Sequence, residues 1–148
     1  MDKDYIRSIA AAIGIGSMLF GAVPAAAPRQ FARLFGFPAP DAATTSMMRS
    51  LGVRDAVLGV GLWSAARHGG NYAPWLLARA LTDGGDTVSV GLAVASGMRQ
   101  SRFLALGGLA LGAAVSEALL WWMARRMRGD RTRVPASMPT GVGHRARA

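Results

Sequence analysis

Long apolar runs alternate with short polar segments along this chain. Four of the runs are each about 20 residues long, the length that crosses a hydrocarbon core of about 30 Å. They span residues 6–26, 46–66, 74–96 and 103–124. This pattern predicts an all-α protein, a membrane four-helix bundle built from residues 1–125.

The first apolar run also has features of a secretory signal peptide. Lys3 and Arg7 precede the apolar stretch, and three alanines at residues 25–27 resemble a cleavage site. Two acidic residues among the first four cancel the positive start, and Pro28 would directly follow the cut, which disfavours cleavage. We therefore expect this run to be retained as a helix.

The segment between the first two runs, residues 28–45, carries Phe31, Leu34 and Phe35 at helical spacing. This spacing is typical of a short helix lying in the membrane interface. An ordinary loop whose aromatic rings touch lipid headgroups fits equally well, so both interpretations stay open. At the other end of the chain, residues 126–148 are polar and are predicted to form a basic, disordered cytoplasmic tail.

The charge distribution predicts an orientation in the membrane. Charged residues make up 17% of the chain and the net charge is +9, whereas soluble domains carry about 25% charged residues. Seven arginines follow the last run: Arg125, Arg126, Arg128, Arg131, Arg133, Arg145 and Arg147. Such clusters hold a helix end in the cytoplasm, so we expect a multi-pass inner-membrane protein with both termini cytoplasmic.

The basic residues also limit the choice of partners. Their position after a membrane helix argues against a nucleic-acid partner and for the lipid bilayer. A topology signal is the simplest account of the tail, and contact with anionic lipid heads, at about 1 kcal/mol per Lys or Arg, is the alternative. The sequence leaves open whether the protein forms a homo-oligomer.

Composition removes several kinds of chemistry. The chain has no Cys and two histidines, His68 and His144. This argues against disulfides, thiolate catalysis and a His/Cys zinc or haem site, so we expect no metal and no cofactor. A Ser/His/Asp arrangement is not expected either, because His68 falls at a helix end and His144 in the tail.

Charged residues inside the apolar runs are the unusual feature of the sequence. Half of the eight acids lie there: Asp55, Asp83, Asp86 and Glu117. Arg49, Arg54 and Arg79 lie there too, away from the start of the chain. Each such charge at a helix centre costs about 2.5–3.5 kcal/mol, while Leu, Val or Ile returns about 0.3–0.6. The second and third helices are therefore expected to pair with each other, with Arg49 near the outer end and able to snorkel.

Depth along the helices predicts which charges meet. Arg54 is level with Asp83 and Asp86, because the second and third helices run in opposite directions. Arg79 lies about 9 Å and Glu117 about 6 Å nearer the cytoplasm than their helix midpoints, at 1.5 Å per residue. We predict two layers: Arg54 with Asp55, Asp83 and Asp86 at midplane, and Arg79 with Glu117 below.

The acids in these layers outnumber the arginines. Two arginines face four carboxylates, and an unpaired buried carboxylate takes up a proton unless a cation or a cationic ligand neutralises it. Ionisable groups inside a membrane mark pathways or sites. The alternative is a purely structural network that fixes the register of the helices.

Glycines at two places predict close helix contacts. Gly108 and Gly112 have the small-xxx-small spacing that permits close approach, although this spacing also arises by chance in a Gly-rich chain. Gly84 and Gly85 separate the two aspartates of the third helix. They either loosen that helix and expose carbonyls or let a neighbouring helix pack tightly, and we favour tight packing.

Several short motifs resemble one family. Gly52-Val53-Arg54-Asp55, then Leu58-Gly59, and Asp83-Gly84 in the next helix are similar to motifs of small four-helix membrane proteins of unknown function. That family carries Gly-x-Arg-Asp in its second helix and Asp-Gly in its third. Phe35-Gly36-Phe37-Pro38 resembles its first loop. The resemblance spans about residues 6–125, implies the four-helix fold and no activity, and puts Arg54, Asp55 and Asp83 at motif positions.

Three functions follow from these features. The first is an inner-membrane protein that binds or passes a proton or a small lipid-like molecule, with Arg54 as anchor, Asp55 orienting it, and Asp83 and Asp86 titrating. The second is a membrane-embedded isomerase, cyclase or hydrolase, with Asp83, Asp86 and Glu117 as candidate acids and bases. The third is a structural or accessory subunit whose charges serve assembly alone.

Overall fold

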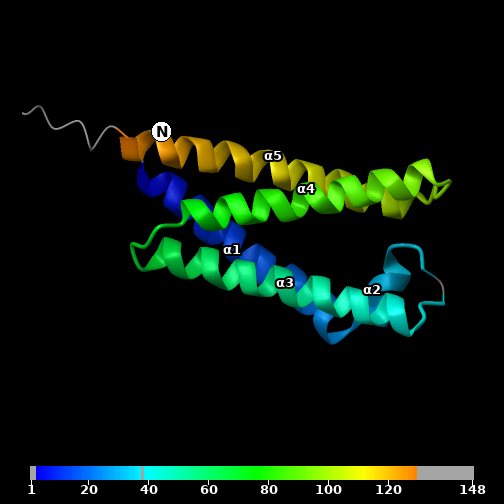
Figure 1. Cartoon of the computed structure of the whole chain (residues 1–148). Helices are drawn as coiled ribbons and strands as arrows, with labels where there is room; N and C mark the ends of the chain where they lie inside the picture. The colour runs from blue at the N-terminus through cyan, green and yellow to red at the C-terminus, as the bar shows by residue number, and fades with distance from the viewer. Residues whose placement is uncertain (1–2, 38, 130–148) are drawn as a thin grey trace, which may run out of the picture.

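The computed structural model describes residues 3–37 and 39–129, and all regular structure in that part is helical (Figure 1). The helices are α1 (Lys3–Ala26), α2 (Pro28–Leu34), α3 (Ala42–Arg67), α4 (Ala73–Ala95) and α5 (Ser101–Gly129). The all-α prediction is confirmed, with five helices rather than four. The four predicted runs correspond to α1, α3, α4 and α5, and α2 is the short helix that the sequence left open.

Two of the helices are long and apolar enough to cross a membrane. By length and composition these are α1, near the N-terminus, and α5 over Ser101–Met127. The intervening helices α3 and α4 have 26 and 23 residues, and both carry charged residues near their middles.

Local signals explain where the central helices begin and end. Asp41 caps α3, because the Thr44 backbone N–H donates to its Oδ1 at 2.7 Å, and this hydrogen bond lowers the pKa of the Asp41 carboxyl. Helices α3 and α4 are both followed by a glycine in the left-handed region, Gly69 at φ 77° and Gly97 at φ 100°. A glycine at this position stops a helix without the steric penalty of a Cβ.

The helices associate as two antiparallel pairs, α1 with α3 and α4 with α5. The first pair is held close by a seam of glycines, Gly14 and Gly21 on α1 and Gly52 and Gly59 on α3. A Cβ built on any of them would lie 2.5–2.8 Å from backbone atoms of the facing helix. The expected charge pairing of α3 with α4 is present through Arg54 and Asp86, but α3 packs mainly against α1, because glycines at matching heights let α1 and α3 touch through their backbones.

The two pairs meet mainly at the end that carries the N-terminus (Figure 1). Ile6, Leu62 and Leu76 are fully buried there in a cluster that also contains Leu120. All buried residues of α4 lie between Ala73 and Asp83, and the rest of that helix is half-buried or exposed. Contact between the pairs thus weakens along α4 toward the end that carries α2.

A second, smaller contact joins the pairs at the α2 end. The ring of Phe37, in the loop after α2, meets the ring of Phe103 on α5 edge-on, with centroids 6.0 Å apart. Gly36 lies against the side chain of Gln100 just before α5. The loop after α2 therefore bridges the two pairs at the end where α4 contributes no buried residue.

Helix α5 is longer than the sequence predicted. It continues to Gly129, so residues 126–129 are helical although they were assigned to a disordered tail. The guanidinium of Arg125 lies over the ring of Trp121 at 5.1 Å, and that of Arg126 over Trp122 at 3.7 Å. These i, i+4 cation–π contacts and the helix propensity of arginine extend the last turns. Residues 130–148 lie outside the described residues.

The glycine contacts predicted in α4 and α5 are absent. A Cβ built on Gly108, Gly112, Gly84 or Gly85 would meet nothing within 4 Å. Helix α4 runs without interruption through its two glycines, so neither loosening nor tight packing is found there. In α5 the neighbouring Gly107 meets Val90 of α4 instead, because the helix turns Gly107 inward and Gly108 and Gly112 outward.

Candidate functional site

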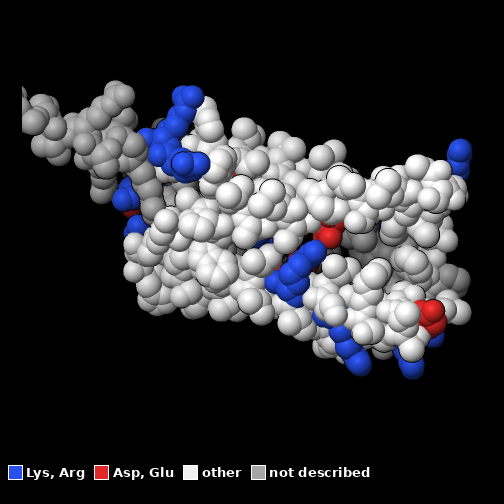
Figure 2. Space-filling model, in the orientation of Figure 1, with Lys and Arg blue, Asp and Glu red and all other residues white. Residues whose placement is uncertain are grey.

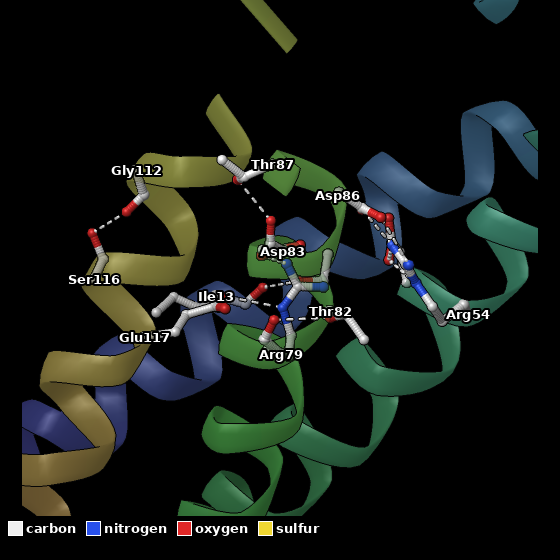
Figure 3. A network of polar contacts seen from close by, with 12 residues as sticks. Ile13, Arg54, Arg79, Thr82, Asp83, Asp86, Thr87, Gly112, Ser116 and Glu117 are labelled. Carbon is white, nitrogen blue, oxygen red and sulfur yellow. Dashed lines mark hydrogen bonds and ion pairs between the residues drawn. The ribbon is translucent and has the colours of Figure 1, made fainter. Parts of the chain in front are cut away.

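The first group of charges centres on Arg54 and joins α3 to α4. Its guanidinium donates to both carboxylate oxygens of Asp86, from Nη1 at 3.1 Å and Nη2 at 2.7 Å (Figure 3). It also donates to Asp55 Oδ1, from Nε at 3.1 Å and Nη2 at 2.9 Å. The two parallel bonds to Asp86 form the bidentate arrangement that is strongest for arginine and carboxylate. We call these three residues the Arg54 cluster.

The second group centres on Arg79 and joins α4 to α5. Arg79 Nε donates to Glu117 Oε1 at 2.8 Å, and Nη2 donates to Asp83 Oδ2 at 2.8 Å (Figure 3). Asp83 lies four residues beyond Arg79 on the same helix, the spacing at which side chains meet. We call Arg79, Asp83 and Glu117 the Arg79 cluster.

The structure brings all six sequence-predicted residues into these two clusters. Contacts of Arg54 with Asp55 and Asp86, and of Arg79 with Glu117, are present as predicted. Asp83 was predicted to face Arg54 and instead pairs with Arg79. Depth along the helix could not decide whether Asp83 pairs with Arg54 or with Arg79. Asp83 is level with Arg54 by this measure, but it lies on the same face of α4 as Arg79.

The two clusters differ in exposure. In the Arg79 cluster the side chains of Arg79 and Asp83 are each 9% exposed and that of Glu117 is 2% exposed. In the Arg54 cluster the side chain of Arg54 is 29% exposed and that of Asp86 35%. Figure 2 shows a small blue and red patch midway along a largely white face, with further charged side chains toward both ends. Charge therefore reaches the surface at mid-length.

The hydrogen bonds of the Arg79 cluster are incomplete. Arg79 Nη1 and Glu117 Oε2 are buried and have no hydrogen-bond partner. A buried polar atom without a partner is costly. The hydroxyls of Thr82 and Thr87 donate to the backbone carbonyls of Arg79 and Asp83 at 2.8 Å, so neither donates to Glu117 Oε2. The cluster therefore has one donor nitrogen and one acceptor oxygen without a hydrogen-bond partner.

Sequence reasoning missed the seam that positions Asp55. Asp55 is 8% exposed, and a Cβ on Gly21 would lie 3.0 Å from the Asp55 Cβ. The carboxylate that holds Arg54 thus sits at the contact between α1 and α3, and it fits there because residue 21 has no side chain. The signal was available as small residues at positions 14, 17 and 21 of α1 and 52 and 59 of α3.

A family model described as a domain of unknown function, DUF4267, matches residues 14–123. The chain belongs to the DUF4267 family. The match covers both charge clusters and the glycine seam, and it agrees with the expected membership of a family without an established activity. No curated protein and no solved structure matches this DUF4267 chain.

Metal binding is another role that carboxylates can have in a site such as that of this DUF4267 chain. Among the described residues, no group of three or more His, Asp or Glu side chains is arranged to hold a metal ion. The carboxylates face guanidinium groups, and each arginine lies between two acids. The arrangement seen in the structure is thus one of ion pairs.

Proposed function

We propose that this protein is a multi-pass inner-membrane protein that binds protons at the Arg54 and Arg79 clusters, within the bilayer. In this proposal α1, α3, α4 and α5 all span the membrane and both termini are cytoplasmic. The observation that carries it is the charge of each cluster: one guanidinium and two carboxylates sum to −1 when all are ionised. Such a charge inside a bilayer is neutralised most simply by one proton.

The length and surface of the helices support the membrane location. Helices of 23–29 residues are about 35–44 Å long at 1.5 Å per residue, close to the 40–45 Å of a bilayer with its headgroups. Large apolar side chains are exposed along every one of the four, as Leu19, Val57, Leu92 and Leu119 illustrate. A soluble protein of this size rarely exposes so many.

The unpaired atoms of the Arg79 cluster support proton binding there. A proton on Glu117 would let Oε2 act as a hydrogen-bond donor, and a carboxylic acid costs far less to bury than a carboxylate. Asp83 is the other acid of this cluster and shares Arg79 with Glu117. The carboxyl groups of these two acids together would hold one proton. Because their titrations are coupled, the proton belongs to the pair and not to one residue.

The gradient of exposure supports exchange of these protons. Asp86 is the most exposed acid of the network, Asp83 lies one turn before it on α4, and Glu117 is the most buried. Protons would enter at the Arg54 cluster and reach Glu117 through Asp83. This order makes the Arg54 cluster the gate of the proposed site and the Arg79 cluster its closed end.

Infrared spectroscopy of the protein in lipid bilayers tests the proposal. A protonated carboxylic acid gives a carbonyl band that ionised carboxylates lack, and the band shifts in deuterated water. We expect wild-type protein at neutral pH to show this band and Glu117→Gln to lose it in whole or in part. Asp41→Asn is the matched control, because Asp41 is exposed and lies outside the network.

The outcome separates proton binding from a purely structural role. A band that is unchanged in both Glu117→Gln and Asp83→Asn would show that the Arg79 cluster holds no proton, and a band that is absent at neutral pH would show that neither cluster does. The ion pairs would then serve only to join α3, α4 and α5. Folding of each variant is checked by helix content, so that loss of the band is not mistaken for loss of structure.

A further inference from the structure

A polar cavity lies at the end of the molecule that carries α2. Its volume is about 470 Å³, within the range of about 300–1,000 Å³ that is typical of small-molecule sites. Its walls come from α2 and the first two turns of α3, together with Ala26 at the end of α1. The polar side chains that line it belong to Arg29, Gln30, Thr45, Ser46 and Arg49.

We propose that this cavity binds the phosphate group of an anionic phospholipid. Two arginines line it, and within residues 3–37 and 39–129 neither of them forms an ion pair with a carboxylate. Guanidinium groups bind phosphate oxygens through paired N–H donors. Two of them on one cavity, beside an amide and a hydroxyl, match the oxygens of a phosphodiester.

The placement of the two arginines is set by the fold. Arg29 lies in the first turn of α2, which begins at Pro28, and Arg49 lies two turns into α3. Phe31 of α2 packs with Met48 of α3 in a small buried cluster, which fixes the short helix against the long one. The hydroxyl of Thr45 donates to the carbonyl of Asp41 at 2.6 Å, so Ser46 is the hydroxyl left to face the cavity.

The position of the cavity favours a lipid over free phosphate; this step rests on the proposed membrane location. Helix α3 has 26 residues, about 39 Å at 1.5 Å per residue, so its first turns lie at headgroup depth. Apolar side chains on the same two helices are exposed beside it, with Leu34 and Met47 each 58% exposed. A lipid would place its phosphate in the cavity and its acyl chains along these side chains.

The test uses the intact protein and a matched control arginine. Arg33 is exposed on α2 and does not line the cavity, so Arg33→Gln removes the same charge from the same helix. Wild type, Arg29→Gln/Arg49→Gln and Arg33→Gln are compared by native mass spectrometry, with phosphatidylglycerol or phosphatidylcholine added to the detergent. A parallel titration adds inorganic phosphate alone.

We expect wild type and Arg33→Gln to retain phosphatidylglycerol in preference to phosphatidylcholine. The double variant should lose this preference, by about tenfold for each arginine removed. The basic segment of residues 126–148 is the same in all three proteins, so its contribution to lipid binding cancels in the comparison. Both arginines are exposed, so the variants are expected to fold; helix content checks this, and the single variants carry the test if the double variant is unstable.

Two results would overturn the inference. One is a preference for phosphatidylglycerol that survives in the double variant. The other is inorganic phosphate displacing the lipid completely at matched concentration, which would make the cavity a site for free phosphate. Neither result bears on proton binding, because the infrared band of Glu117 is measured separately and Glu117→Gln leaves the cavity intact.

Discussion

Arg79 and Glu117 hold α4 to α5 through a 2.8 Å hydrogen bond between Nε and Oε1, at a point where 2% of the Glu117 side chain is exposed. A charge pair at such burial recovers its desolvation cost only while both partners are present. Each of the two residues is therefore expected to destabilise the folded protein once the other is removed.

Removal of Arg79 should be among the most destabilising single changes in the chain. Arg79→Met leaves Asp83 and Glu117 buried together without a cation, and we expect a loss of about 3–5 kcal/mol in unfolding free energy. This loss is measured by unfolding the protein in mixed micelles of a mild and a denaturing detergent. Arg67→Met, at the exposed end of α3, is the control and should be close to neutral.

The neutralised triple variant completes this test. Arg79→Met combined with Asp83→Asn and Glu117→Gln removes all three charges and should recover most of the lost stability. A triple variant as unstable as Arg79→Met alone would show that shape, and not unpaired charge, causes the loss.

Arg54 should show a rescue that depends on which aspartate is neutralised. Arg54→Met is expected to cost about 1–3 kcal/mol, less than Arg79→Met because this cluster is partly exposed. Asp86→Asn should restore part of that loss, since Asp86 is the bidentate partner of Arg54. Asp83→Asn should restore none, because its cation is Arg79. Equal rescue by both would mean that the arginine exchanges partners.

The sequence anticipated the helices and most of the charge pairs, because both depend on positions along a single helix axis. Apolar length located α1, α3, α4 and α5, and a constant rise per residue brought Arg79 level with Glu117. Rotation about the helix axis cannot be read in this way. That is why Asp83 was paired with Arg54 and why Gly108 and Gly112 were expected to meet a neighbour.

The pairing of α1 with α3 was missed for a related reason. Because burying Arg54 and Asp55 is costly, the sequence predicted that α3 pairs with the charged residues of α4. Backbone contact at Gly14, Gly21, Gly52 and Gly59 instead fastens α3 to α1, and the side chain of Arg54 reaches Asp86 of α4. Small residues at matching heights were a stronger packing signal than opposite charges.

Substitution in this seam should destabilise the protein more than substitution of an outward-facing glycine. Gly52→Val would place Cβ 2.5 Å from the Gly21 carbonyl oxygen, and overpacking of this kind costs about 1–3 kcal/mol or more when backbone must move. Thermal unfolding in detergent measures the loss. Gly108→Val is the control and should cost far less, because its Cβ would meet nothing within 4 Å.

Asp41 gives a pH dependence that is separable from the network. Its folded pKa is lowered by the hydrogen bond from Thr44, so the cap contributes stability above the unfolded pKa of about 4 and loses it as pH falls through the folded value. The stability of wild type relative to Asp41→Asn should therefore decline in acid, as followed by thermal unfolding across this range. Parallel pH profiles would contradict the assignment.

Cysteine scanning decides between two and four membrane spans, and the absence of native cysteine makes each introduced thiol unambiguous. Ala39, Gly70 and Ser96 are exposed in the three connections after α2, α3 and α4. If α3 and α4 both span, a membrane-impermeant maleimide added to intact spheroplasts labels Ala39→Cys and Ser96→Cys, and labels Gly70→Cys only after permeabilisation. If only α1 and α5 span, all three label from the same side. The latter result would remove the bilayer from around the Arg54 and Arg79 clusters, and with it the reason for each to carry a proton.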